Sequence, residues 1–134
     1  MIDLTIKENA IQLHRDLWNK VADMIDNGEV TLDEIQNAHL LKSRVLKQLG
    51  INRHITSNCP ACEYGSYIND NDNIGATPCD YCPIQWPSNV NQYMCIDVER
   101  DDGLGLYSEF EYCDILEDAS TLARRIANLP ESRR

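Results

Sequence analysis

Residues 5–28 read TIKENAIQLHRDLWNKVADMIDNG, and this stretch sets the class of the fold. It opens with Thr5 and Glu8 at the spacing of a capping box, in which two side chains satisfy free N–H groups at a helix start. Apolar residues then recur every three or four positions, as along the buried face of an amphipathic helix. They are Ile6, Ala10, Leu13, Leu17, Val21 and Met24. The pattern predicts a helix that ends near Gly28.

The same start signal returns at Thr31 and Glu34. Apolar positions follow at helical spacing as far as Leu49, and Gly50 stands where a left-handed C-terminal cap is expected. Two helices joined by so short a turn pack antiparallel. We therefore expect an N-terminal helical hairpin over residues 5–50.

A C-terminal helix is predicted over residues 104–130. Its clearest part begins at a further capping-box pair, Asp114 and Glu117, and ends before Pro130, which cannot continue a helix. Residues 104–113 also fit helical spacing and extend the helix backwards.

The middle of the chain has a different composition. Residues 51–103 hold four of the five prolines and five of the six cysteines. Such a composition is typical of loops, so we expect an irregular region there, with one short strand over residues 93–98. The sequence thus predicts a single, mainly α domain over residues 1–134, made of a helical hairpin, a small zinc-binding region and a C-terminal helix.

The cysteines form the most specific motif. Cys59 with Cys62 and Cys79 with Cys82 are two Cys-x2-Cys pairs, separated by 16 residues, a spacing typical of four-cysteine zinc sites. The x2 spacing lets two thiolates face one metal ion, and a second pair completes a tetrahedron. We expect one structural Zn²⁺ held by these four residues, with Cys95 as the alternative to one of them. A site closed by four protein ligands has no open position for substrate, so an enzyme is not expected.

Three other interpretations of the cysteines stay open. A disulfide scaffold requires an oxidising compartment, a redox dithiol uses one pair at a helix N-terminus after a strand, and an iron–sulfur cluster usually has a shorter run of cysteines. His54 is an alternative metal ligand. His14 and His39 are expected at the helix surface or at caps, and Cys113 in the core.

Charge is concentrated in the same region. The formal net charge is −10, and residues 51–113 alone carry ten acidic side chains against Arg53 and Arg100. Negative charge disfavours nucleic acid, whose affinity depends mainly on Lys and Arg, and favours a protein with a basic surface. Aromatic side chains near the cysteines suit such an interface. The candidate partner-binding residues are Tyr64, Tyr67, Tyr81, Trp86, Asp97, Glu99, Asp101 and Asp102.

The order of these motifs resembles a family of small zinc-knuckle proteins encoded by tailed bacteriophages. The resemblance spans about residues 58–130. It rests on CPACEY at 59–64, CDYCPIQWP at 79–87, Cys95, Tyr107 and ARRIANLP at 123–130. Phe110 stands where the family often has tryptophan, and residues 5–50 do not match it.

The resemblance implies a phage accessory protein made in the cytoplasm of the bacterial host, with Cys59, Cys62, Cys79 and Cys82 as metal ligands. Together with the acidic middle, it predicts a protein that binds and modulates a host protein, in host takeover or anti-defence. No apolar run approaches the length of a membrane span. A homo-oligomer is compatible with the sequence.

Two other functions are compatible with the chain. A nucleic-acid-binding zinc ribbon, acting in phage transcription or replication, needs a basic stripe. Its candidate residues are Lys42, Arg44, Lys47, Arg124, Arg125, Arg133 and Arg134. A binder of a small signalling nucleotide needs a cation for phosphate, for which Arg124 or Arg125 is available.

Overall fold

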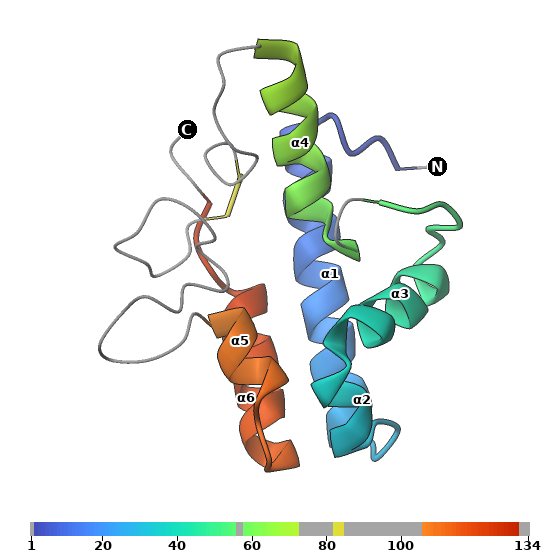
Figure 1. The fold of residues 1–134 in the computed structure, drawn as a ribbon, viewed down its shortest axis with the longest axis vertical. Helices are drawn as coiled ribbons and strands as arrows, with labels where there is room; N and C mark the ends of the chain where they lie inside the picture. The colour runs from blue at the N-terminus through green and yellow to red at the C-terminus, as the bar shows by residue number, and fades with distance from the viewer. Residues whose placement is uncertain (1, 56–57, 73–81, 85–105, 132–134) are drawn as a thin grey trace.

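The computed structural model describes residues 2–55, 58–72, 82–84 and 106–131. Within these residues the chain is mainly helical and has no strand, in agreement with the expected class. Ile84 and Glu131 form an isolated antiparallel bridge. The helices, shown in Figure 1, are α1 (Lys7–Asp26), α2 (Leu32–Gln36), α3 (Ala38–Gln48), α4 (Pro60–Asp72), α5 (Leu106–Glu111) and α6 (Leu116–Ala127). The predicted strand 93–98 lies outside the described residues.

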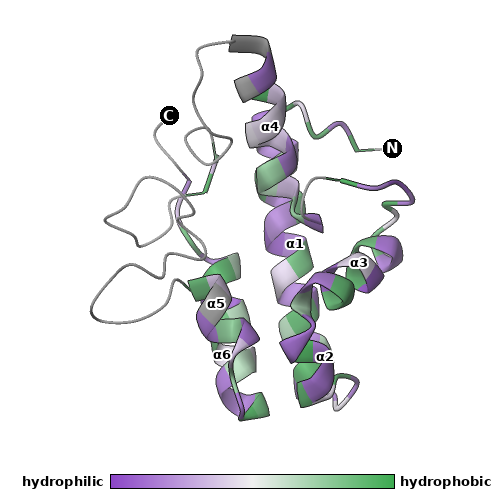
Figure 2. Ribbon diagram, viewed as in Figure 1, coloured by the Kyte–Doolittle hydropathy of each residue, from purple (hydrophilic) through white to green (hydrophobic). Residues whose placement is uncertain are grey.

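Helix α1 is the central element of the bundle and contacts α3, α4 and α6 (Figure 1). The apolar stripe predicted from the sequence is buried, apart from Ile6. Trp18 widens this face and is almost fully buried. Figure 2 shows apolar and polar residues alternating along the helices, as expected where each helix buries one face.

Helix α6 is the most extensive partner of α1 and runs antiparallel to it. Ser120, near the start of α6, donates a 2.5 Å hydrogen bond to Asp26 at the end of α1. Beyond the other end of α6, Glu131 lies 3.3 Å from Lys7. Small residues on the buried face of α6, among them Ala119 and Ala123, allow the two helices to approach closely.

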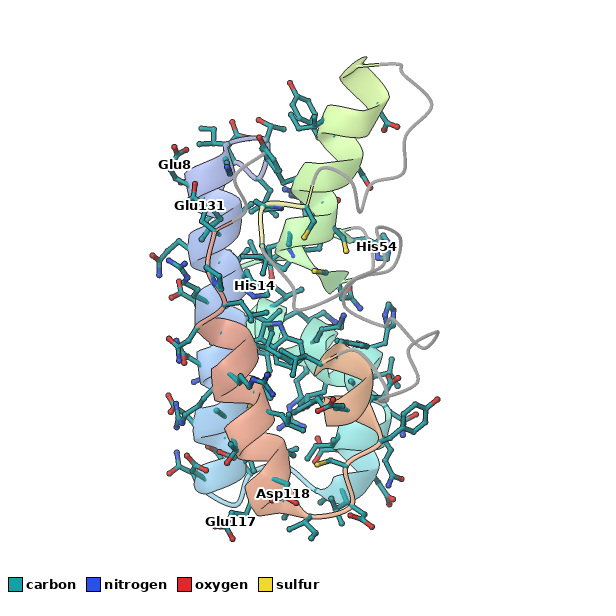
Figure 3. The ribbon with its side chains drawn as sticks, turned by 90° about the vertical axis from the view of Figure 1, so that its left-hand side faces the viewer. Glu8, His14, His54, Glu117, Asp118 and Glu131 are labelled. Atoms are coloured by element: carbon teal, nitrogen blue, oxygen red, sulfur yellow. The ribbon has the colours of Figure 1, made fainter. Side chains whose placement is uncertain are left out.

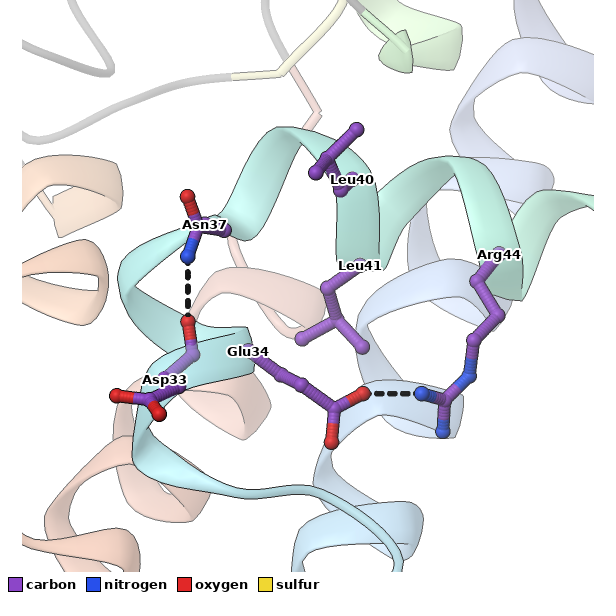
Figure 4. Close-up of a pocket in the computed structure, with 6 residues that line it drawn as sticks. All are labelled: Asp33, Glu34, Asn37, Leu40, Leu41 and Arg44. Carbon is purple, nitrogen blue, oxygen red and sulfur yellow. Dashed lines mark hydrogen bonds and ion pairs between the residues drawn. The ribbon is translucent and has the colours of Figure 1, made fainter.

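The second arm of the predicted hairpin is not one helix. It is divided at Asn37, whose φ of −114° and ψ of 49° are not helical. The Asn37 amide donates to the carbonyl of Asp33 at 2.8 Å (Figure 4), a local bond through which asparagine competes with helical pairing. Helix α3 therefore leaves α2 at an angle, and α1 pairs mainly with α6. The expectation of a simple hairpin over residues 5–50 was wrong in this respect.

The predicted C-terminal helix is likewise two helices. Helices α5 and α6 pack against each other, joined by residues 112–115. Ile115 precedes α6 with extended backbone angles and no side-chain cap. The capping box predicted at Asp114 and Glu117 is therefore wrong, because the helix begins one residue later.

The outcome at the other helix ends is mixed. The Thr31 and Glu34 capping box is present, with both reciprocal hydrogen bonds. The box predicted at Thr5 is absent, because Thr5 bonds to Asp3 instead and Ile6 precedes α1 without a side-chain cap. Gly50 has a φ of +92° and ends α3 as predicted.

Helix α4 lies in the region expected to be irregular. It forms because small residues on one face, Ala61 and Gly65, are buried where α4 packs along α1 (Figure 1). Pro60 occupies its first position, where the fixed φ of proline favours helix and no N–H is needed. The prediction of loop structure throughout residues 51–103 was therefore wrong for Pro60–Asp72.

Candidate metal centre

The first cysteine pair lies at the N-terminal end of α4. Cys59 directly precedes the helix, and its carbonyl accepts the N–H of Glu63 at 3.0 Å. Cys62 lies in the first turn, three residues on and so on the same side of the helix. The two thiol groups hydrogen-bond to each other. A helical turn, rather than the loop expected from the sequence, thus brings the pair together.

The surroundings of Cys59 favour its thiolate. The neighbouring thiol of Cys62 holds the pKa of Cys59 well below its ordinary value, with smaller effects in the same direction from His14 and from the positive charge of Lys42, although burial acts in the opposite direction. The positive end of a helix dipole acts in the same sense. Because metals bind thiolates rather than thiols, Cys59 is well suited to be a ligand.

Cys113 has the opposite character. Burial raises the pKa of its thiol, and the negative charges of Asp118 and Asp114 add to this effect. It lies in the turn between α5 and α6 and packs against the core, as the sequence indicated. Among the described cysteines, which are Cys59, Cys62, Cys82 and Cys113, no disulfide forms.

His14 is a functional candidate that sequence reasoning missed. It is fully buried, and Figure 3 places it in the interior of the bundle, so the expectation of a surface or capping histidine was wrong. Its Nε2 lies 3.1 Å from the carbonyl oxygen of Ile126. Since a carbonyl oxygen can only accept, Nε2 carries a proton. The signal was available: His14 follows Ala10 by four residues and precedes Leu17 by three, which places it on the apolar face.

Lys42 supplies a buried positive charge near Cys59. Its side chain is 6% exposed, and its Nζ lies 4.4 Å from the centre of the Tyr107 ring, a cation–π contact. The Tyr107 ring lies edge-on to Trp18, with 5.9 Å between ring centres. The imidazole of His14, on α1, and the ammonium group of Lys42, on α3, therefore lie near the cysteine pair.

Of the second predicted pair, Cys79 and Cys82, the structure describes only Cys82. It is buried on the segment 82–84, which lies beside α4 in Figures 1 and 3. Ile84, fully buried, anchors this segment in the core. Cys79 and Cys95 lie outside the described residues. Among the residues that are described, no three His, Cys, Asp or Glu side chains are grouped closely enough to hold a metal ion.

The other histidines are not grouped with this cluster. His54 is exposed and lies at the periphery of the bundle (Figure 3). His39 is exposed, and its ring Nε2 lies 3.1 Å from the side-chain amide of Asn58. Asn58 has a φ of +49°, a conformation that asparagine tolerates better than most residues, and it directly precedes Cys59.

Two of the predicted partner-binding residues lie on α4. Tyr64 is partly buried against the core, whereas Tyr67 is 42% exposed. Glu63 and Asp70 share a face with Tyr67, since they stand four residues before and three after it. The remaining candidates fall outside the described residues: Tyr81, Trp86, Asp97, Glu99, Asp101 and Asp102.

Three of the seven cations proposed for a nucleic-acid stripe are buried or already paired. Lys42 is buried, and Arg44 pairs with Glu34 beside a pocket of about 270 Å³ at the α2–α3 junction (Figure 4). Arg124 lies 2.9 Å from Asp23 and 2.8 Å from Asp26.

The helices that carry these cations do not join them into one surface. Helices α3 and α6 lie on opposite sides of α1 in Figure 1. Arg125 is exposed, and Arg133 and Arg134 lie outside the described residues. The condition for the nucleic-acid interpretation, two basic clusters brought together, is thus not met by the residues described.

None of the described helices is both long and apolar enough to cross a membrane. No protein-family model, curated protein or solved structure matches the chain.

Proposed function

We propose that this chain is a non-enzymatic binding protein, an accessory protein of a tailed bacteriophage that acts in the cytoplasm of its host. One structural Zn²⁺, held by Cys59, Cys62, Cys79 and Cys82, fixes α4 against the segment that carries the second pair. A host protein with a basic surface binds the acidic and aromatic face beside it. The observation that carries the proposal is the cysteine pair at the start of α4, in which the thiolate of Cys59 is favoured.

The chemistry of the donors suits zinc, although Cys82 is not yet grouped with Cys59 and Cys62 in the described part of the chain. Thiolates suit a borderline-soft ion without geometric preference of its own, and Cys59 and Cys62 lie together at the start of α4. A four-thiolate site is closed to water and substrate, so its role is to hold structure. Four thiolates and one Zn²⁺ carry a charge of −2, which adds to the negative charge of residues 51–113.

The partner surface includes one face of α4. Glu63, Tyr67 and Asp70 recur at intervals of four and three residues along that face. An aromatic side chain flanked by carboxylates suits a partner that offers Arg or Lys, because the ring can receive a cation while the carboxylates attract it.

Affinity capture from host lysate tests the proposal. The full chain, loaded with zinc, should retain one host protein at stoichiometric level, with less retained as salt is raised. Tyr67→Ala should abolish capture, because truncating an interface aromatic typically costs about 2 kcal/mol or more. Tyr112→Ala is the matched control, since Tyr112 is 70% exposed on α5–α6. The proposal would be contradicted if Tyr67→Ala retained as much of the host protein as Tyr112→Ala does. It would also be contradicted if the unsubstituted chain retained no stoichiometric partner at low salt.

A redox dithiol is the second candidate, favoured by the same helix N-terminus and the lowered pKa of Cys59. Cys59 and Cys62 would form a disulfide, and their two electrons and two protons would pass to oxidised glutathione, which becomes two molecules of reduced glutathione. Equilibration with glutathione mixtures separates the candidates. A zinc-loaded chain keeps both thiols, whereas a redox dithiol converts at a defined potential without releasing metal.

A further inference from the structure

A second polar site lies at the C-terminal end of α3. It is a pocket of about 240 Å³ between the last turns of α3 and the segment that returns to α4. Its polar lining residues are Ser43, Lys47, Asn52, Arg53, His54 and Asn58. Neither the proposed zinc ligands nor the α4 face of the proposed partner surface line it.

The lining is rich in cations in a chain whose net charge is −10. Lys47 and His54 have no ion-pair partner in the described part of the chain, and both are exposed. Arg53 lies 3.5 Å from Glu63, and side-chain exposures of 36% and 29% leave that pair screened by water. An anion entering the pocket would therefore meet the cations Lys47 and Arg53 and the imidazole of His54.

The frame of the pocket is fixed. The N–H groups of Gly50 and Ile51 bond to the carbonyls of Lys47 and Leu46, at 3.1 and 2.9 Å, so these helix-end acceptors are already satisfied. Ile51 and Ile55 are buried and anchor the returning segment. The Asn58 amide donates to the carbonyl of His39 at 3.0 Å, which fixes the Asn58 side chain where it lines the pocket.

The groups left to face a ligand are therefore mainly donors. Ser43 supplies a hydroxyl, Asn52 an amide and His54 an imidazole N–H, and Lys47 and Arg53 supply charged N–H groups. A phosphate group accepts several hydrogen bonds at once and is bound most strongly by charge-assisted donors. Arg53 suits it in particular, because a guanidinium can bind phosphate through two parallel bonds.

We propose that this pocket binds the phosphate group of a small phosphorylated molecule. A nucleic acid is disfavoured, because its many phosphates would also approach the acidic remainder of the chain. A single phosphate presents its charge only where the cations are. This site differs from the sequence expectation for a signalling nucleotide, which relied on Arg124 or Arg125; Arg124 is paired with Asp23 and Asp26.

Isothermal titration of the full zinc-loaded chain tests the proposal, at constant ionic strength. The probes are inorganic phosphate, adenosine 5′-monophosphate and adenosine. Phosphate and the nucleotide should both bind saturably, and adenosine should not. Equal affinity of the two would show that the pocket recognises phosphate alone, and tighter binding of the nucleotide would identify the source of the phosphate as a nucleotide. Absence of saturable binding of either at millimolar concentration would overturn the proposal.

Variants locate the binding. Lys47→Gln and Arg53→Gln should each weaken phosphate binding about ten-fold or more, the effect of losing one charge-assisted hydrogen bond. Arg125→Gln is the control, since it removes the same charge from an exposed position on α6 and should leave affinity unchanged. Circular dichroism checks that each variant folds. If Arg125→Gln weakened binding as much as Lys47→Gln, the attraction would be non-local and the pocket assignment wrong.

Discussion

Helix α1 is packed in two different ways. Against α5 and α6 it buries aromatic and aliphatic side chains, with Trp18 edge-on to Phe110 at 5.1 Å between ring centres. Toward the start of α4 it instead presents His14, close to Cys59 and to the buried Lys42. Burial of apolar surface is enough to stabilise the packing of α1 against α5 and α6. The second contains polar groups, which cost free energy to bury unless they bond to one another or to a metal.

Removing the largest core side chain should damage the first region most. Trp18→Ala deletes a 2% exposed indole, and such truncations typically cost about 3–5 kcal/mol. Urea unfolding should show this loss as a lower midpoint at pH 7. The control, Tyr112→Ala, truncates a 70% exposed ring and should change stability by less than about 0.5 kcal/mol. A loss below about 1 kcal/mol for Trp18→Ala would mean that the aromatic cluster does not form the core.

Removing metal should affect the second region selectively. Structural zinc contributes apparent binding free energies of about 10–16 kcal/mol in zinc-finger peptides. If even a small part of this stabilises α4, chelation should raise amide exchange in residues 60–68 by about 100-fold, which corresponds to roughly 2.7 kcal/mol. Amides in the facing parts of α1 and α6 should change far less.

Hydrogen exchange with mass spectrometry measures both regions in one sample. Cys59→Ser should reproduce the effect of the chelator, whereas Cys113→Ser should not, because Cys113 is not among the proposed ligands. If chelation raised amide exchange equally in all helices, the two regions would unfold together, and the distinction between them would be wrong.

His14 joins the two regions, since it bonds to Ile126 and lies beside Cys59. His14→Leu keeps a side chain of similar size but loses the bond to the Ile126 carbonyl, which still accepts the N–H of Leu129 at 3.3 Å. We expect a loss of about 1 kcal/mol, the net contribution of a typical hydrogen bond, together with weaker zinc binding. His54→Leu, at an exposed position, should change neither. Unchanged stability and zinc affinity in His14→Leu would remove this residue from the site.

The smallest effect on stability is expected where the end of α1 meets the start of α6, at the hydrogen bond between Asp26 and Ser120. A hydrogen bond from Ser120, and then one from Arg124, hold the pKa of Asp26 below its ordinary value. A carboxyl whose pKa is lowered on folding stabilises the native state above about pH 4 and loses this contribution as pH falls further. Ser120→Ala should therefore raise the pKa of Asp26 and destabilise the chain slightly at pH 7 but not at strongly acidic pH.

Carboxyl carbon NMR, followed against pH, measures this shift directly. Thr121→Ala is the matched control, since Thr121 is exposed on the same helix and bonds only within it, to the Glu117 carbonyl. If the pKa of Asp26 were the same in Ser120→Ala and in the unsubstituted chain, the bond between α1 and α6 would have no electrostatic role.

The sequence predicted the first region well, for physical reasons. Apolar periodicity is strong along α1 and α6, and Gly28, which marks the end of α1, has a positive φ of +75°. Periodicity does not report how helices pair, so the predicted hairpin missed α6 as the main partner of α1. It also does not detect a single local bond, such as the one from Asn37 that divides α2 from α3.

The second region was harder to predict. Helix α4 is rich in Gly, Asn and Asp, whose intrinsic preference opposes helix, and it forms through packing of Ala61 and Gly65 and a start at Pro60. The pairing of Cys59 with Cys62 was predictable from their spacing. The approach of His14 and Lys42 was not, because it depends on how α1, α3 and α4 meet in space.

Native mass spectrometry of the full chain tests the account most directly. The sample is measured before and after chelation, with Cys59→Ser and Cys113→Ser alongside. We predict one zinc ion per chain, lost on chelation, absent from Cys59→Ser and retained by Cys113→Ser. No zinc in the unsubstituted chain, or two ions per chain, would contradict a single site built on the cysteine pair of α4.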